Sequence, residues 1–377
     1  MTTSDGRTTS AAIESALQRA LDLGECGVQV AATLHGEPIV DTWAGSRDEA
    51  GTAVGGNTLF PVFSVTKVVT ATAAHLQVQR GLLSYDEPVC AKWPEYAAHG
   101  KSDISLGHVL SHRSGAPCVD TDATLDQLCD WDWMTSMLAD QVPVAKPDVS
   151  NAYSPYAFGW IVGELVRRSD PLRRSFAQFV RDEVLLPLKM VDFHLGVPRE
   201  EMYRVATLLG AEPPIPVPGS LVECASVRSL PLGPSGFNTT KVRRAVLPSF
   251  GGVSSARSVV RLFEPYARSG RVGKAAWLTT DVIDRCRRPR PGSVDETYGV
   301  VMPVGLGALW HVAPGVSANG PITSVLSHTA AGGTIAWAEP ETGLAVSICH
   351  NRMFQGPQPN ASFAALGDAI RASVQDR

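Results

Sequence analysis

The residues best suited to chemistry are a serine and a lysine three positions apart, in the run Ser64-Val65-Thr66-Lys67. Residues i and i+3 of a helix lie on one face, so the lysine ammonium can fold back onto the serine hydroxyl. A serine hydroxyl is a poor nucleophile until a base takes its proton. A lysine can be that base only when burial or neighbouring cations lower its pKa from about 10.4. The spacing therefore indicates a serine nucleophile with Lys67 as its base, although a serine that only caps a helix gives the same pattern.

The sequence around this pair supports the chemical interpretation. The apolar run 59–63 precedes Ser64 and two valines follow Lys67, so the lysine is expected to be buried. The apparent helix continues to Gly81, and the backbone N–H groups at its start can hold an oxyanion. Other catalytic signatures are missing: the sequence has no HExxH, no GxxxxGK[ST], no GxGxxG opening a helix and no GxSxG.

Composition narrows the classes of function. The chain has 377 residues, of which 44% are hydrophobic and 19% are charged, which is typical of a globular protein with a sizeable core. Its net charge is −4 and it has no basic run, so we expect no nucleic-acid partner. No apolar stretch approaches the roughly 18–20 residues of a bilayer span, and the N-terminus MTTSDGRTTS lacks the layout of a signal peptide. We therefore expect a cytoplasmic protein that does not span a membrane.

The cysteines show no metal-binding pattern. All seven are scattered, without a CxxC pair and without a histidine at ligand spacing. In a cytoplasmic protein they are expected to be reduced and to serve in packing. We expect neither a metal ion nor an organic cofactor. The sequence carries no signal for an oligomeric state.

The two ends of the chain predict a sheet with flanking helices, and the middle predicts helices. Strand-like runs occupy 27–34, 38–45, 334–340 and 343–351, and helical periodicity occupies 11–23, 105–112, 123–139, 156–168, 175–188 and 361–374. The segment 210–250 is rich in proline and predicts loops.

From this distribution we predict an α/β (α+β) sandwich. Residues 1–86 and 246–377 are expected to form an antiparallel sheet flanked by helices. Residues 87–245 are expected to form an inserted, mainly helical subdomain. The active site is expected in the cleft between the two parts.

Four stretches resemble the serine β-lactamase and penicillin-binding-protein superfamily. Ser64-Val65-Thr66-Lys67 with the following VVTATAAHLQVQRGLLSYDEPV resembles its nucleophile helix, in particular that of class C β-lactamases and family VIII carboxylesterases. ISLGHVLSHRSGAP (104–117) resembles its helix ending in a His-x-Ser-Gly turn, NAYSPYAFGWIVGEL (151–165) its catalytic tyrosine segment, and SHTAAGGTIAWAEPETGLAVSICHNRM (327–353) its oxyanion strand. The resemblance covers about residues 15–355 and implies a β-lactamase/transpeptidase-like fold.

The resemblance implies three catalytic residues. Ser64 matches the acylated nucleophile, Lys67 its general-base partner and Tyr153 the second proton-transfer residue. A phenol suits this task if the nearby lysine lowers its pKa from about 10. Without the resemblance, Tyr153 would be interpreted as a ring packed at the start of a helix.

The resemblance also implies residues that bind the substrate. The N–H groups of Ser64 and Ala331 are expected to form the oxyanion hole, with Gly332 permitting close backbone approach. His328, Gly332 and Trp337 are expected to line the substrate site. His112 is expected to stabilise the turn that ends its own helix rather than to act in catalysis.

Two departures from the class C pattern favour esters over penicillins. Where those enzymes carry Tyr-x-Asn, this chain has Pro155 in place of the amide, and where they carry Lys-Thr-Gly it has His328 in place of the cation. The leading hypothesis is a serine carboxylesterase that acts on small-molecule esters with short acyl or secondary-metabolite groups. An acyltransferase with the same residues is the first alternative, and a β-lactamase or D-amino-peptidase the second. A catalytically inactive binding module is the alternative from another class.

Overall fold

The computed structural model describes residues 8–292, 294–354 and 361–375. Residues 1–7, which belong to the N-terminus interpreted above as lacking a signal peptide, lie outside the described residues. The strands are β1 (Gly27–Leu34), β2 (Glu37–Gly45), β3 (Phe60–Phe63), β4 (Phe193–Leu195), β5 (Leu209–Gly210), β6 (Gly252–Ser254), β7 (Arg271–Val272), β8 (Ala275–Ala276), β9 (Trp310–Ala313), β10 (Ile322–Thr329), β11 (Ile335–Glu339), β12 (Leu344–His350) and β13 (Arg352–Met353). The helices are α1 (Ala11–Asp22), α2 (Thr66–Gln79), α3 (Leu106–Leu110), α4 (Leu125–Cys129), α5 (Trp131–Asp140), α6 (Ala157–Ser169), α7 (Phe176–Val180), α8 (Leu221–Cys224), α9 (Pro234–Phe237), α10 (Thr240–Arg244), α11 (Ala256–Ala267), α12 (Thr280–Cys286) and α13 (Ala364–Gln375).

Strands from both ends of the chain form one antiparallel sheet, as the sequence predicts. Within the described residues its order is β2-β1-β12-β11-β10-β9. Val30 of β1 pairs with Thr42 of β2 on one side and with Ile348 of β12 on the other. The sheet therefore joins the N-terminal hairpin directly to the C-terminal strands.

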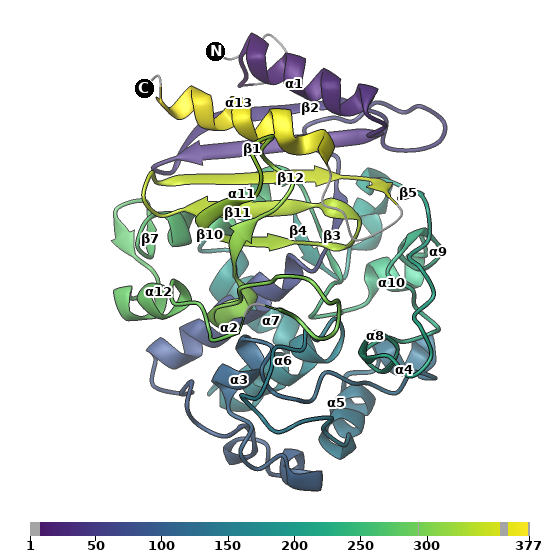
Figure 1. Ribbon diagram of the computed structural model, residues 1–377, viewed down its shortest axis with the longest axis vertical. Helices are drawn as coiled ribbons and strands as arrows, with labels where there is room; N and C mark the ends of the chain where they lie inside the picture. Colours follow the sequence, from purple (N-terminus) through teal and green to yellow (C-terminus); the bar gives the residue numbers. More distant parts are fainter. Residues whose placement is uncertain (1–7, 293, 355–360, 376–377) are drawn as a thin grey trace.

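The two faces of this sheet pack against different helices (Figure 1). α1 and α13 contact each other and lie over one face, where Ile13, Leu17, Val30 and Ile348 belong to one apolar cluster. α11 packs on the other face, against β1, β11 and β12. Because successive side chains of a strand point to opposite faces, each central strand contributes to both cores.

The middle of the chain supplies α3 to α10, with the short strands β4 and β5 among them (Figure 1). α2 packs against α6, so the helix that follows Ser64 is held by this helical part. The predicted boundaries of the helical part, at residues 87 and 245, stay predictions.

Two stretches predicted as single helices are interrupted. The stretch 123–139 divides at Asp130, whose extended backbone ends α4 and whose carboxylate accepts the Trp133 N–H at 3.0 Å to begin α5. Aspartate is a favoured residue at a helix start, so the break had a local signal that periodicity alone overlooks. In 175–188, α7 runs into a π-helical turn at Arg181–Leu185.

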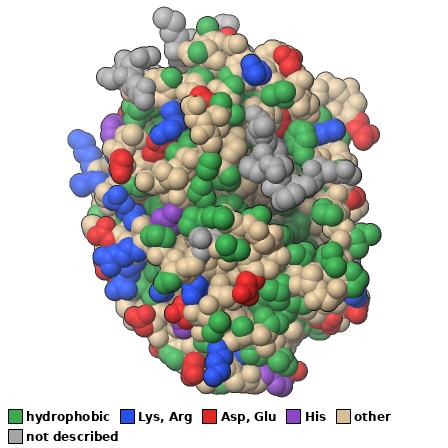
Figure 2. Space-filling view, in the orientation of Figure 1, with side chains coloured by type: hydrophobic (Ala, Val, Ile, Leu, Met, Phe, Trp, Pro, Cys, Tyr) green, Lys and Arg blue, Asp and Glu red, His purple; other side chains and the backbone are tan. Residues whose placement is uncertain are grey.

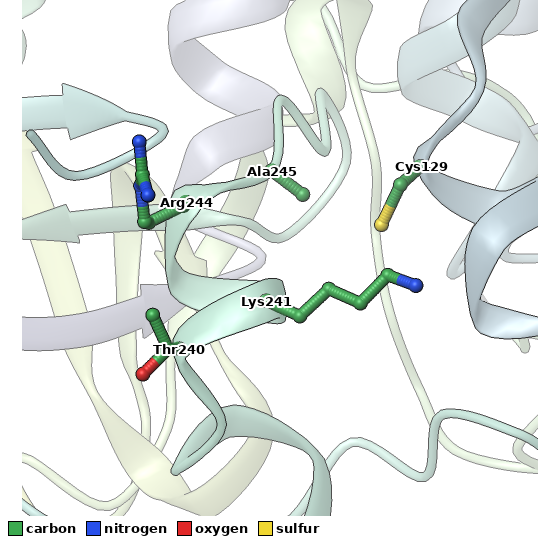
Figure 3. A pocket seen from close by; sticks show the side chains of 5 residues that line it. All are labelled: Cys129, Thr240, Lys241, Arg244 and Ala245. Carbon is green, nitrogen blue, oxygen red and sulfur yellow. The ribbon is translucent and has the colours of Figure 1, made fainter.

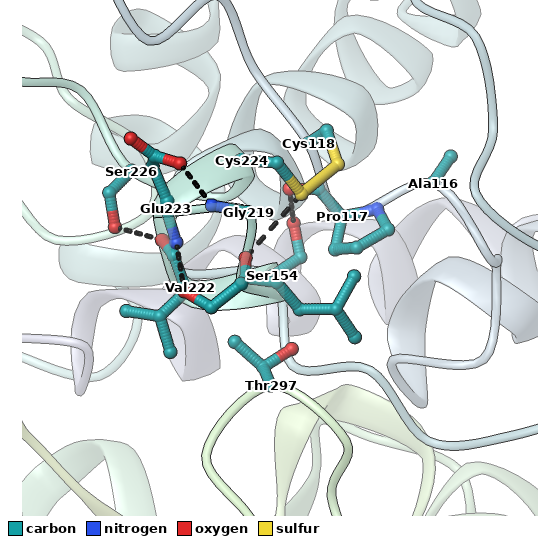
Figure 4. The surroundings of a disulfide bond; sticks show 12 residues. Ala116, Pro117, Cys118, Ser154, Gly219, Val222, Glu223, Cys224, Ser226 and Thr297 are labelled. Carbon is teal, nitrogen blue, oxygen red and sulfur yellow. Dashed lines mark hydrogen bonds between the residues drawn. A yellow bond between two sulfur atoms is a disulfide. The ribbon is translucent and has the colours of Figure 1, made fainter. Parts of the chain in front are cut away.

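The prediction that all cysteines are reduced is wrong for two of them. Cys118 and Cys224 form a disulfide bond across 106 positions of the sequence. Figure 4 shows the bond close to Pro117 and Ser154. Sequence spacing gave no hint of it, because partners this far apart meet only through the fold. The bond ties the loop after α3 to α8, within the segment 210–250 that predicted loops.

Gly159 lets α6 approach the chain segment that holds the active-site lysine. A Cβ at this position would collide with the backbone of Pro248 and Ser249. We expect Gly159→Ala to lower the free energy of unfolding by about 1–3 kcal/mol, because backbone on the far side must shift. Urea denaturation measures the change. Gly55→Ala is the control, because a Cβ there meets only one atom of the flexible Asn57 side chain. Equal losses in the two variants would contradict the prediction.

Candidate active site

Ser64 lies in the turn between β3 and α2. The residue before it, Phe63, has a positive φ of 42°, a strained backbone conformation that is typically stored at functional sites. Thr66 fixes the turn, because its hydroxyl donates to Phe63 O at 2.5 Å and accepts the Gly252 N–H of β6 at 2.9 Å. The turn therefore holds the Ser64 side chain at the start of α2, where it is 5% exposed.

The Lys67 amine is surrounded by three oxygen atoms. Its Nζ lies 3.2 Å from Ser64 Oγ, 2.8 Å from Pro155 O and 3.1 Å from Ser249 O. The side chain has no exposed surface, and burial lowers the pKa of the amine well below its usual range. A neutral amine has two N–H groups and one lone pair. When the N–H groups donate to the two carbonyls, the lone pair faces the Ser64 hydroxyl, which is the arrangement of a general base.

Tyr153 lies beside this pair. Lys67 Nζ is 5.0 Å from the centre of the Tyr153 ring, and the Tyr153 side chain is hydrogen-bonded to that of Ser64. Burial raises the pKa of the phenol well above its usual range, and the hydrogen bond to Ser64 only partly opposes this. The expectation that the pKa of Tyr153 is lowered is therefore wrong, because burial of the phenol is the largest effect on it. In the resting protein Tyr153 is a proton donor.

A loop that the sequence did not single out holds the Tyr153 backbone. Asp295 accepts the Tyr153 N–H at 2.5 Å and the Tyr298 N–H at 2.9 Å, and Thr297 donates its hydroxyl to Tyr153 O at 2.9 Å. The Tyr298 ring centre lies 5.7 Å from that of Tyr153. Asp295 stands in an irregular stretch, so hydrophobic periodicity could not reveal it. Burial raises the pKa of its carboxyl, which the backbone N–H donors partly counteract.

His328 is the second-last residue of β10 and lies beside Tyr153. Its ring centre lies 5.2 Å from that of Trp310 and 6.3 Å from that of Tyr153. Burial, with a smaller effect of Lys67, lowers the pKa of His328 to about 3. Its Nδ1 lies 2.8 Å from Thr329 O, which places the proton of the neutral ring on Nδ1. The residue therefore presents an uncharged ring to the site.

The side chain of His112 bonds to the tyrosine segment and not, as the sequence predicts, to the turn that ends its own helix. Its carbonyl accepts the Ala152 N–H at 2.8 Å, and its Nδ1 accepts the Ser154 N–H at 3.2 Å. Its ring centre lies 4.3 Å from that of Tyr153. His112 thus joins the turn after α3 to the tyrosine segment from both sides of Tyr153.

The residues expected to border the substrate divide between two places. Ala331 and Gly332 lie in a 3₁₀ turn, Ala331–Gly333, between β10 and β11, rather than within a strand. Gly332 has a φ of +79°, and a Cβ there would collide with the side chain of Met353. Trp337 does not reach the site. It is fully buried in the apolar cluster beneath α1 and α13. His328 pairs with Ala336, which contributes to the apolar cluster on the opposite face of the sheet.

Comparison with known proteins establishes the family of this chain. The family model described as Beta-lactamase matches residues 13–371. The chain belongs to the beta-lactamase family. A curated relative, "Esterase/beta-lactamase LipL" of Mycobacterium tuberculosis, is 29% identical over 369 residues, covering 93% of this chain and 83% of that protein.

Solved structures of the family share the fold. A family VIII carboxylesterase superposes with a TM-score of 0.86 at 26% identity and covers 96% of both chains. A penicillin-binding-protein homologue from Caulobacter crescentus superposes with a TM-score of 0.85 at 27% identity and covers 96% of this chain and 97% of its own. The β-lactamase/transpeptidase-like fold is thereby established. The protein belongs to an enzyme family that includes esterases and β-lactamases.

Among the described residues, no group of His, Cys, Asp or Glu side chains could hold a metal ion, and no helix has the length and apolar character needed to cross a bilayer. An open hollow of about 570 Å³ lies between α10 and α4, lined by Cys129, Thr240, Lys241, Arg244 and Ala245 (Figure 3). Lys241 forms an ion pair with Asp126 there, so its charge is already matched.

The buried, neutral His328 gives the protein a pH-dependent stability. Below about pH 6.5 the unfolded chain binds a proton on this residue, whereas the folded protein does so only near pH 3. The free energy of unfolding therefore falls as the pH drops, and this residue accounts for about 2 kcal/mol between pH 7 and pH 5. We expect His328→Asn to reduce the loss between these two pH values by about that amount. Urea denaturation at both pH values is the measurement, and an unchanged loss would contradict the prediction.

Proposed function

We propose that this protein is a serine carboxylesterase that cleaves uncharged small-molecule esters through an acyl-enzyme on Ser64. One observation carries the proposal. The Lys67 amine is placed to accept the Ser64 proton, while His328 is uncharged at the position where the lactamases hold a substrate carboxylate with a cation. The similarity to a family VIII carboxylesterase over nearly the whole chain supports the same substrate class.

The proposed reaction has two acyl-transfer steps. The Ser64 hydroxyl gives its proton to Lys67, and its oxygen attacks the ester carbonyl carbon. Tyr153, whose phenol is protonated, donates its proton to the leaving alkoxide and regains one from the Lys67 ammonium. Water then gives a proton to the Lys67 and Tyr153 pair and attacks the acyl-enzyme, and Ser64 recovers its proton as the acid leaves.

The oxyanion of both steps is assigned to two backbone N–H groups, those of Ser64 and Ala331. Ser64 lies at the start of α2, and Ala331 begins the 3₁₀ turn that follows the strand of His328. Oxyanion holes of two fixed N–H donors are a large source of rate enhancement because they need no reorganisation. Gly332 supports this assignment, since its positive φ lets the turn pass close to Met353.

Three other functions rank below ester hydrolysis. An acyltransferase would use the same Ser64, Lys67 and Tyr153 with an alcohol in place of water, and an added alcohol would then yield a new ester. A β-lactamase or D-amino-peptidase would need a different way to hold a charged substrate. A binding module without catalysis would have no need for a buried amine beside a serine hydroxyl. The partner throughout is a small-molecule ester.

The cytoplasmic location expected from the sequence stays a proposal. The Cys118–Cys224 disulfide weighs against it, because cytosolic thiols are kept reduced in most organisms. The oligomeric state is open.

We expect Ser64→Ala to abolish turnover of p-nitrophenyl acetate. The alanine removes the nucleophile and is expected to leave the fold intact, because the capping position of α2 is Val65 and no side chain caps this helix. Turnover is followed by release of p-nitrophenol, and circular dichroism shows that the variant is folded. Retention of more than about a hundredth of the wild-type rate would disprove the acyl-enzyme, given that loss of a catalytic nucleophile costs far more.

A second prediction separates esters from lactams. A penicillin needs a cation for its carboxylate and an amide for its side chain, and this chain has His328 and Pro155 at those positions. Each lost charge-assisted hydrogen bond costs about 1.5–3 kcal/mol. We expect kcat/KM for p-nitrophenyl acetate to exceed that for nitrocefin by at least about a hundredfold, and His328→Lys to narrow the gap.

The measurement is a steady-state assay of both substrates on one preparation, with Ser64→Ala as the blank. Nitrocefin hydrolysis as fast as ester hydrolysis would show that His328 and Pro155 do not set the substrate class.

A further inference from the structure

Asp295 is a buried carboxylate without a cation beside it. Figure 2 shows Asp and Glu side chains spread over the surface that it draws, where water stabilises their charge. Six carboxylates of the described residues are buried instead. Five of them form an ion pair: Glu25 with His350, Glu164 with Arg167, Asp170 with Arg174, Glu264 with Arg261 and Glu339 with Arg371. Asp295 is the sixth, and within the described chain its partners are backbone N–H groups alone.

Burial of this carboxylate costs stability, so its place in the fold is not explained by packing. An anion buried without a cation is unfavourable, and an apolar residue would pack better. Oδ2 of Asp295 accepts the Tyr153 N–H at 2.5 Å, and Oδ1 accepts the Tyr298 N–H at 2.9 Å. The bond to Tyr298 is local and closes a turn. The bond to Tyr153 joins segments that are 142 positions apart and reaches the residue proposed to protonate the leaving group.

Tyr153 lies in an extended stretch that is held from two sides. His112 binds both neighbours of the tyrosine: its carbonyl accepts the Ala152 N–H at 2.8 Å, and its Nδ1 accepts the Ser154 N–H at 3.2 Å. Neither bond involves the peptide group between Ala152 and Tyr153. Among the described residues, the N–H of this peptide group has one partner, Asp295. Rotation of this peptide group would move the Tyr153 Cα and with it the phenol.

We propose that Asp295 is a positioning residue that keeps the Tyr153 hydroxyl at the leaving oxygen of the ester. The assignment rests on the proposed esterase function. As the bond between the carbonyl carbon and the leaving oxygen breaks, the Tyr153 proton passes to that oxygen, and Tyr153 takes the proton that Lys67 received from Ser64. A misplacement of about 1 Å can cost about a hundredfold in rate. Thr297, whose hydroxyl donates to Tyr153 O at 2.9 Å, supports the same residue from its next peptide group.

A carboxylate is the side chain that suits this place. It only accepts hydrogen bonds, and it can accept the N–H groups of Tyr153 and Tyr298 on two different oxygens. An asparagine would turn its NH₂ group towards one of these N–H groups and lose that bond. Burial raises the pKa of Tyr153 most, and the charge of Asp295 adds to this effect, which keeps the phenol protonated.

The test compares two acetate esters that differ in their leaving group. p-Nitrophenolate is a weak base and leaves without a proton, whereas ethoxide is a strong base and needs one. Both esters give the same acetyl-enzyme, so their kcat/KM values differ in the acylation step. In Asp295→Ala we expect the ratio of kcat/KM for ethyl acetate to that for p-nitrophenyl acetate to fall at least about tenfold. Asp295→Asn, which keeps one acceptor oxygen, is expected to give a smaller fall.

Glu296→Gln is the matched control. It removes the same charge from the next residue, which is exposed and whose carboxylate accepts the Ser150 hydroxyl at 2.9 Å. The ratio is expected to keep its wild-type value there. A second control adds Asp295→Ala to Tyr153→Phe, where we expect no further change in the ratio because no hydroxyl is left to position. A structural role of Asp295 alone would slow both esters equally.

Release of p-nitrophenol and release of acid at constant pH follow the two reactions, and circular dichroism shows whether each variant is folded. Thr297→Val provides a further variant, which removes one hydroxyl and is expected to lower the ratio in the same direction. If Asp295→Ala does not fold, Asp295→Asn and Thr297→Val decide the question.

The outcomes are distinct. An unchanged ratio in folded Asp295→Ala, or in both Asp295→Asn and Thr297→Val, would overturn the positioning role but not the esterase. An equal fall in Glu296→Gln, a further fall in the Tyr153→Phe background, or a wild type that cleaves p-nitrophenyl acetate through Ser64 but not ethyl acetate would overturn it as well. Absence of Ser64-dependent turnover of either ester by the wild type would overturn the proposed function and the positioning role with it.

Discussion

The structure depends on keeping a lysine amine against a serine hydroxyl in the interior. Removing an ammonium from water is costly, so burial lowers the pKa of Lys67 well below its usual range. Its two carbonyl partners, Pro155 O and Ser249 O, come from the turn before α6 and from the segment before β6. The close packing of α6 at Gly159 brings those two segments together. The chemistry at Ser64 is thus set by the docking of helices that are distant in sequence.

The side chains around Lys67 have shifted pKa values because they are buried as well. A cation near Lys67 would help to lower its pKa but would also attract anions into the site. Here the nearby His328 and His112 rings have lowered pKa values because they are buried, and the Tyr153 phenol keeps its proton. Desolvation alone therefore prepares Lys67 as a base. The uncharged His328 ring is the reason that we propose neutral esters rather than penicillins as substrates.

The sequence predicted what local patterns can encode. Strong periodicity identified the strands β1, β2, β11 and β12 and the terminal helices, and the Ser64 to Lys67 spacing predicted the contact between these two side chains. Trp337 shows the limit of prediction from the sequence. A shift of one residue along a strand moves a side chain to the other face of the sheet, so the correct strand does not fix the correct face. The distant partners Cys118 and Cys224 could not be paired from spacing. Asp295 was missed because its role lies in accepting backbone N–H groups, which no residue pattern records.

Tyr153 shows why the substrate site is harder to predict than the reaction. Its N–H and carbonyl are bound by Asp295 and Thr297, its ring packs against His112, and the next residue lies beside the disulfide to α8. Three separate segments therefore surround Tyr153. The motif residues need only a helix and a turn, which the sequence encodes locally. The surfaces that touch the substrate are irregular loops positioned by long-range bonds, so their arrangement becomes visible only in the folded chain.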